Sequence, residues 1–304
     1  MSAVASLRAL LGRAIDYAGM FPPCSLGPEP ALKNQAEYVR SADSWMLSTF
    51  VLPITKFGDA GLLISQFDKQ HPLRISALGA KTEDAKAFLS ELKITAEAIR
   101  LFQGQHLDVA PIVQLEMFLP QDVDLGKLSE ATALIADLRL QCFWETQAES
   151  AEKGIGLLAR AKQPAFAYKL RTGGVTADAF PSSVQIARAM LASTKHHVAM
   201  KFTAGLHHPV RQFRDEVKTE MHGFLNVLGA GVLSAEHHWD EAQTIEMLED
   251  QRTDSFEFHD TVFAWRDWEV TLDRIKARRK FITSFGSCSF DEPREDLRVL
   301  NLHL

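Results

Sequence analysis

The chain has 304 residues, of which 46% are hydrophobic and 24% are charged, values close to the averages for globular domains. This composition excludes a disordered, collagen-like or disulfide-scaffold chain, and the length is sufficient for a large core. The net charge of −6, from 33 basic and 39 acidic residues, gives no support to a nucleic-acid-binding surface.

The first twenty residues do not resemble a signal peptide, because Arg8 and Asp16 interrupt their apolar stretch. Leu7, Leu11 and Ile15 recur at helical spacing and predict a short amphipathic helix. No apolar run approaches the roughly 20 residues of a membrane span, so we expect no membrane association. Three scattered cysteines are too few for a disulfide framework, which favours a reduced, cytoplasmic protein.

Short apolar runs alternate along the chain with longer segments of helical period. The runs with the length of strands are 14–21, 47–53, 73–78, 110–118, 141–146, 165–172, 197–203 and 255–263. The segments with helical period are 30–42, 59–67, 83–101, 125–138, 148–162, 182–194, 220–235 and 268–280. Each predicted strand is therefore followed by a predicted helix.

Eight strand–helix units predict a closed parallel barrel of the (β/α)8 TIM type. We expect one domain over residues 1–304, with an N-terminal helix and with residues 281–304 as a C-terminal extension that covers part of the barrel. The alternative is an open doubly wound sheet, which usually has a glycine-rich turn after its first strand. The turn at 16–23 lacks the G-x-G-x-x-G pattern, which favours the barrel.

Charged residues interrupt the later strands where a barrel enzyme carries its chemistry, at the carboxyl ends. The alternation of residues places Lys169 and Arg171 on one face of their strand, and Lys201 on the matching face of the next. Glu116 and Glu145 come from the two preceding strands. Buried charges are costly unless they are paired, so these residues indicate either a functional site or a structural network of ion pairs.

A catalytic lysine is the sharper of these two interpretations. A buried lysine beside a second cation has a lowered pKa, and a neutral amine attacks carbonyl groups to form a Schiff base. In this hypothesis Lys169 forms the imine, Lys201 lowers its pKa, and Glu116 or Glu145 transfers protons. The predicted activity is that of a lyase of the aldolase type.

Small residues follow the cationic strands and let backbone N–H groups approach an anion, although glycines in loops are often simple turn residues. The Arg171 guanidinium beside two of them suits a carboxylate or phosphate. We therefore expect a small anionic substrate. The predicted anion-binding residues are Arg171, Gly173, Gly174, Thr203, Gly205, His207 and His208.

Residues 168–174, Tyr-Lys-Leu-Arg-Thr-Gly-Gly, and residues 200–205, Met-Lys-Phe-Thr-Ala-Gly, resemble the paired lysine strands of the deoxyribose-phosphate aldolase family. The resemblance implies a class I aldolase barrel without a cofactor, with Lys169 as the Schiff-base residue and Lys201 as the neighbour that lowers its pKa. Glu116 is the nearest counterpart of the proton-relay carboxylate of that family. The similarity is limited to residues 168–208, and Arg171 stands where the family has a small hydroxyl residue.

Two further alternatives remain open at this stage. His207, His208 and His259, together with a glutamate, are the residue types of a divalent metal site, as in a metal-dependent hydrolase or lyase, although no short metal-binding motif is present. The second alternative is a non-catalytic barrel in which the charged residues form a structural network. The nearly uniform apolar segment 222–233 predicts a buried helix, which is also suited to contact between subunits of a homo-oligomer.

Overall fold

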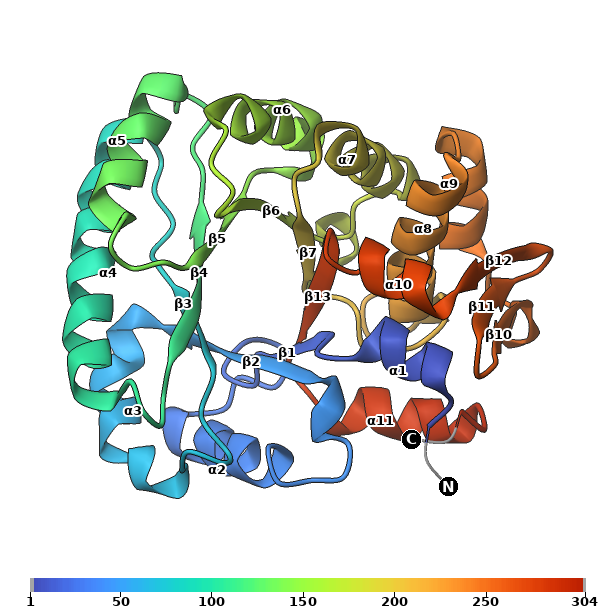
Figure 1. Cartoon of the computed structure of the whole chain (residues 1–304), viewed down its shortest axis with the longest axis horizontal. Coiled ribbons are helices and arrows are strands. Elements are labelled where there is room, and N and C mark those ends of the chain that lie inside the picture. The colour runs from blue at the N-terminus through green and yellow to red at the C-terminus, as the bar shows by residue number, and fades with distance from the viewer. Residues whose placement is uncertain (1–2, 303–304) are drawn as a thin grey trace.

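The computed structural model describes residues 3–302 and shows eight parallel strands that close into a barrel, seen along its axis in Figure 1. Its strands are β1 (Ile15–Tyr17), β2 (Leu47–Pro53), β3 (Ile75–Leu78), β4 (Ile112–Phe118), β5 (Gln141–Glu145), β6 (Phe166–Arg171), β7 (Met200–Thr203) and β13 (Ile282–Ser287). Strand β1 pairs with both β2 and β13, which closes the ring and excludes an open sheet. The predicted (β/α)8 barrel is confirmed.

Helices follow the barrel strands in sequence and form the outer ring (Figure 1). They are α2 (Pro28–Tyr38), α3 (Phe57–Leu62), α4 (Ala85–His106), α5 (Leu125–Ile135), α6 (Ala151–Ala161), α7 (Ser183–His196), α8 (Phe224–His237) and α11 (Asp291–Val299), while α1 (Ala5–Leu11) precedes the first strand. Local signals define several helix starts. The Ser182 side chain, for example, accepts a hydrogen bond from the Gln185 backbone in a capping box at α7.

The predicted eighth strand, 255–263, lies outside the barrel. It forms β10 (Phe256–Phe258) and the start of β11 (Val262–Trp265), which join β12 (Trp268–Thr271) in a three-stranded antiparallel sheet. The predicted helix 268–280 is accordingly divided into β12 and α10 (Leu272–Arg278). Alternating large apolar residues stabilise this small sheet against α1 and α8, and they resemble the pattern of a barrel strand.

The actual eighth strand is β13, within the segment expected to be a C-terminal extension. Residues 282–287 therefore belong to the barrel, and α11 after them is its eighth helix. Ser284 and Gly286 lie on one face of β13, and the Ser284 hydroxyl bonds Asp16 inside the barrel. The small residues on that face make the segment look like a loop in the sequence.

Additional elements lie between β7 and β13. They are a hairpin of β8 (Gln212–Arg214) and β9 (Thr219–Met221), helix α9 (Glu241–Glu249), the small sheet and α10. Helix α8 is buried over almost its whole length and contacts α7, α9 and α10 of the same chain. The predicted buried helix at 222–233 is thus present, and its own chain covers it; the homo-oligomer stays a prediction.

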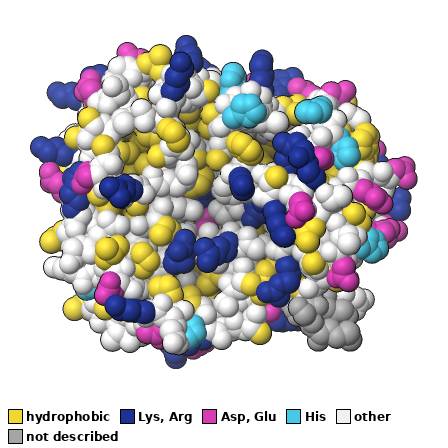
Figure 2. Space-filling model, viewed as in Figure 1, with side chains coloured by type: hydrophobic (Ala, Val, Ile, Leu, Met, Phe, Trp, Pro, Cys, Tyr) yellow, Lys and Arg dark blue, Asp and Glu magenta, His cyan; other side chains and the backbone are white. Residues whose placement is uncertain are grey.

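The two faces of the barrel strands differ sharply in polarity. On β6 the Tyr168 ring packs outward beside Gly154 of α6, whereas Lys169 points inward and bonds Glu116 on β4. In the space-filling view, basic side chains surround the centre of the visible face and an acidic side chain lies between them (Figure 2). Inside the barrel, Lys169 and Glu116 replace part of the apolar interior that barrels of this type usually contain. Within residues 3–302, no helix combines the length and apolar character needed to cross a membrane.

Candidate active site

A cavity of about 230 Å³ opens at the carboxyl ends of the barrel strands. Apolar residues, among them Phe21, Pro22, Val51, Leu78 and Val175, form much of its wall. Its charged lining consists of Glu116, Lys169 and Arg171, and His207 lines it too. A largely apolar hollow with a few convergent polar groups is the usual form of a small-molecule site.

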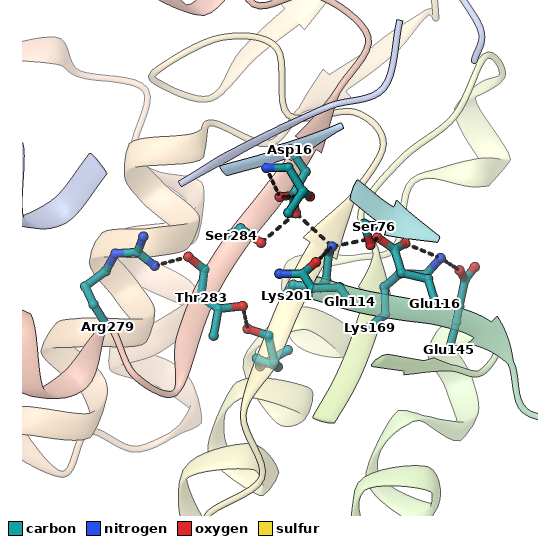
Figure 3. Close-up of polar contacts among 12 residues, drawn as sticks. Asp16, Ser76, Gln114, Glu116, Glu145, Lys169, Lys201, Arg279, Thr283 and Ser284 are labelled. Carbon is teal, nitrogen blue, oxygen red and sulfur yellow. Dashed lines mark hydrogen bonds and ion pairs between the residues drawn. The ribbon is translucent and has the colours of Figure 1, made fainter. Parts of the chain in front are cut away.

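Lys169 provides an amine at this cavity and is held between two carboxylates. Its Nζ atom lies 3.0 Å from Glu116 Oε2 and 2.6 Å from Glu145 Oε2 (Figure 3). The lysine is only 4% exposed. Because β5 and β6 are neighbours in register at Glu145 and Lys169, the contact to Glu145 follows directly from the sheet, whereas the contact to Glu116 crosses the interior.

Lys201 lies deeper than Lys169 and does not line the cavity. Its Nζ atom is 2.6 Å from Glu116 Oε1, 2.8 Å from Asp16 Oδ2 and 2.9 Å from Gln114 Oε1 (Figure 3). Phe143 closes one side, with its ring centre 4.8 Å from the amine. Glu116 therefore joins the two lysines, which are paired in register on β6 and β7.

The electrostatic balance of this network favours the charged forms of Lys169, Lys201 and Glu116. Burial acts to lower the pKa of Lys169, but Glu116 and Glu145 outweigh burial and raise it above its ordinary value. The pKa of Lys201 is raised in the same way by Asp16 and Glu116. Burial acts against the Glu116 carboxylate too, yet Lys201 and Lys169 hold its pKa well below the usual range.

The expectation that Lys201 lowers the pKa of Lys169 is therefore not met. The two amines do not face each other as bare cations, because the Glu116 carboxylate lies between them. Lys169 is an ammonium group at neutral pH in this arrangement. Any reaction of its amine requires prior transfer of a proton to a neighbouring carboxylate, and Glu145 and Glu116 are both in hydrogen-bond contact.

Several members of the network were absent from the predicted site. Asp16 on β1 accepts hydrogen bonds from the Thr49 hydroxyl at 2.6 Å and the Ser284 hydroxyl at 2.6 Å, and Ser76 donates to Glu116 at 2.6 Å. These residues are single polar positions in otherwise apolar strands. That pattern could have identified them, because a polar residue on the inward face of a barrel strand requires a partner there.

Of the predicted anion-binding residues, Arg171 and Gly174 line the cavity, whereas Gly173 and Gly205 do not. Arg171 is half exposed, and its Nε atom donates to Glu145 Oε1 at 3.1 Å. It also lines a neighbouring hollow of about 450 Å³ that contains Glu145 and Lys81, so it forms a wall between the two spaces. Gly174 lines the first cavity.

The remaining small residues mainly support the loops. Gly205 has a φ of +75°, and a Cβ there would lie 2.8 Å from the Gly173 Cα atom, so the two backbones cross in close contact. The Thr172 hydroxyl donates to the Ala204 carbonyl at 2.6 Å and fixes this crossing. Thr203 lines the cavity at the end of β7.

The histidines proposed as metal ligands do not converge. His207 Nδ1 lies 2.9 Å from Glu292 Oε2, and His208 Nδ1 lies 2.6 Å from Asp296 Oδ2. The two carboxylates belong to α11. His259 is exposed beside Glu257 and follows β10 directly. Among the residues that the structure describes, no cluster of three His, Cys, Asp or Glu side chains is arranged to hold a metal ion. The set of three histidines is therefore not one site, because β10 lies outside the barrel.

The arrangement as a whole can hold a small molecule against a buried lysine, with carboxylates to accept its protons and a guanidinium at the rim. His207, whose Nδ1 atom is bonded to Glu292, also lines the cavity. Comparison with protein-family models and with curated protein sequences finds no match to this chain.

Proposed function

We propose that this barrel is a lyase of the aldolase type, which acts on a small anionic carbonyl compound through a Schiff base on Lys169. The single observation that carries the proposal is the position of the Lys169 amine, which lines the cavity while it contacts both Glu145 and Glu116. Active sites of barrels of this type lie at the carboxyl ends of the strands, where this cavity opens. The fold itself is commonly enzymatic.

The first step is the release of the amine from its ion pairs. The Lys169 ammonium transfers a proton to Glu145, its closest carboxylate at 2.6 Å, as the carbonyl carbon approaches. The neutral nitrogen attacks that carbon to give a carbinolamine, which loses water and leaves an imine between Lys169 and the substrate. The water that leaves consists of the carbonyl oxygen and two protons.

The second step is proton transfer at the carbon beside the imine. Glu116 lines the cavity next to Lys169 and serves as the base, while the protonated imine accepts the electron pair of the C–H or C–C bond that breaks. Lys201 acts as a positioning residue here, because it holds Glu116 Oε1 at 2.6 Å from below.

Arg171 is the residue that selects an anionic substrate. Its guanidinium stands at the rim of the cavity, where a substrate carboxylate competes with Glu145 for it. Such competition loosens Glu145 and makes it a better acceptor for the Lys169 proton. The apolar remainder of the wall suits a substrate whose other end is a short alkyl group.

Reductive trapping tests this proposal. The protein is incubated with pyruvate, 2-oxobutyrate, acetaldehyde or acetone, reduced with borohydride, and examined by intact mass and peptide mapping. We expect a stable adduct on Lys169 and none on Lys201, which is a matched control because it is equally buried but does not line the cavity. Lys169→Met removes the adduct. Folded protein that gives no Lys169 adduct with any of these carbonyls overturns the proposal.

A further inference from the structure

Cys24 and Cys288 lie in contact at the edge of the cavity, although 264 residues separate them in the chain. Their Sγ atoms are 3.0 Å apart. Cys24 is exposed in the loop between β1 and α2, whereas Cys288 is buried directly after β13 and lines the cavity. Both are free thiols, and the third cysteine, Cys142, is buried in β5.

The backbone around the pair is already held in place. The Ala18 N–H donates to the Ser287 carbonyl at 2.7 Å, which joins the start of the loop to the end of β13. The Leu26 N–H donates to the Gly19 carbonyl at 2.9 Å and closes the loop on itself, with Cys24 between these anchors. A disulfide bond needs the two sulfurs to approach to about 2.05 Å, so only a small local movement is required.

We propose that Cys24 and Cys288 form a reversible dithiol–disulfide site that reacts with low-molecular-weight disulfides such as glutathione disulfide. The exposed Cys24 thiolate attacks one sulfur of glutathione disulfide, which forms a mixed disulfide and releases one glutathione thiolate. The Cys288 sulfur then attacks Cys24 Sγ, gives up its proton, and releases the second glutathione as a thiol. The protein loses two hydrogen atoms and one glutathione disulfide becomes two glutathione molecules.

The order of these steps follows from the surroundings of the two sulfurs. Burial, together with the neighbouring Cys24 sulfur, raises the pKa of Cys288 to about 12, so its thiol is a poor initial nucleophile. Cys24 is open to solvent and meets the oxidant first. Cys288 needs no encounter with the oxidant, because its sulfur is already in contact with Cys24.

The bond would cross-link two walls of the cavity. The loop from β1 supplies Phe21 and Pro22, and the end of β13 supplies Gly286 and Cys288 itself. Oxidation therefore fixes the loop against the eighth strand on one side of the opening. This makes the pair a chemical modification site on the cavity wall, whatever reaction the cavity carries out.

A glutathione titration tests the site directly. Reduced protein is equilibrated without oxygen in mixtures of glutathione and glutathione disulfide, quenched in acid, alkylated with N-ethylmaleimide, and analysed by intact mass and non-reducing peptide mapping. We expect the loss of two thiols together and a peptide cross-linked between Cys24 and Cys288, reversed by dithiothreitol. Cys142→Ser is expected to behave as the wild type does.

Two variants keep the result unambiguous. Cys288→Ala is expected to accumulate the mixed disulfide on Cys24, whereas Cys24→Ser, a substitution at an exposed position, is expected to form neither product. Wild-type protein that accumulates only the mixed disulfide, or that never forms the Cys24–Cys288 cross-link at any ratio, overturns the proposal. A cross-link to Cys142 also overturns it.

The consequence for the cavity rests on the proposed function and has a separate readout. With the cross-link formed, and with cyanoborohydride as the reductant because it leaves disulfides intact, we expect slower trapping of pyruvate on Lys169 in wild-type protein and no change in Cys24→Ser treated in the same way. An equal rate in oxidised and reduced protein overturns this effect on the cavity. Absence of trapping in both states counts against the Schiff base and leaves the mass measurement of the disulfide to decide the redox site.

Discussion

Glu116 and Lys201 form an ion pair of 2.6 Å that joins β4 to β7 across the interior of the barrel, and both residues are buried. The same carboxylate reaches Lys169 through its other oxygen at 3.0 Å. One glutamate thus balances two buried ammonium groups, with Asp16 and Glu145 as the outer carboxylates. Removal of any member leaves an uncompensated charge where water has little access, which makes the network testable by stability as well as by chemistry.

Lys201→Met is expected to destabilise the protein by about 3–5 kcal/mol, because it leaves Asp16 and Glu116 buried with one cation fewer. Equilibrium urea unfolding at neutral pH measures the change. Lys127→Met is the matched control, since its ion pair with Glu130 is exposed to solvent and contributes little to stability. Equal effects of the two substitutions would show that the buried network does not stabilise the barrel.

Glu145→Gln is expected to slow imine formation on Lys169 by about 100-fold or more, because the amide cannot accept the ammonium proton. The rate of reductive trapping with pyruvate measures the effect. Unfolding by urea is monitored in parallel, so that loss of rate is not confused with loss of structure. A trapping rate like that of the wild type would exclude Glu145 as the proton acceptor.

Arg171→Met is expected to weaken the binding of pyruvate by about tenfold or more, the typical loss for a charge-assisted hydrogen bond. Binding of acetaldehyde should change little, because it has no anionic group to meet the guanidinium at the rim. The concentration dependence of trapping gives both affinities with the same protein. A parallel loss for the two carbonyls would assign Arg171 a structural role through its bond to Glu145.

His222 predicts a pH-dependent loss of stability on acidification. Burial lowers its pKa from 6.5 to about 4, in a site where Nε2–H donates to the Pro181 carbonyl and Nδ1 accepts from Arg211. The unfolded chain binds more protons between these two pKa values, so stability rises with pH through that window and falls on acidification. The contribution amounts to at most about 3 kcal/mol.

His222→Gln tests this assignment, because its amide can donate to Pro181 and accept from Arg211 without titrating. We expect the difference in unfolding free energy between wild type and variant to change between pH 6.5 and pH 4, and to be constant above pH 6.5. Urea unfolding at a series of pH values measures it. Parallel curves across the whole range would contradict a lowered pKa at His222.

Gly205→Ala is expected to destabilise the protein by about 1–3 kcal/mol, because the residue has a positive φ and its Cβ would press on the Gly173 backbone. Gly104→Ala is a suitable comparison. That glycine lies within α4 with no atom near its Cβ position, so alanine should stabilise the helix by up to about 1 kcal/mol. Thermal unfolding of both variants checks the opposite signs.

The sequence alone determined the fold class and the inward face of the charged strands. Alternation of strands and helices predicts a parallel barrel, and alternation within β6 places Lys169 and Arg171 opposite the apolar Tyr168 and Leu170. These are local properties, since the period of the chain and the polarity of each residue decide them. They sufficed to select both lysines and both glutamates of the network before their contacts were known.

Tertiary structure decided the partners, because contacts across a closed barrel join residues far apart in the chain. No local pattern reveals that Glu116 lies between Lys169 and Lys201, or that it thereby raises the pKa of Lys169. Strand β13 was missed in the sequence for the same reason. Its inward residues are small, and only their contacts with Asp16 and with the neighbouring strands identify the segment as part of the barrel. Closure of the ring brings the last strand against the first, and with it Cys288 against Cys24.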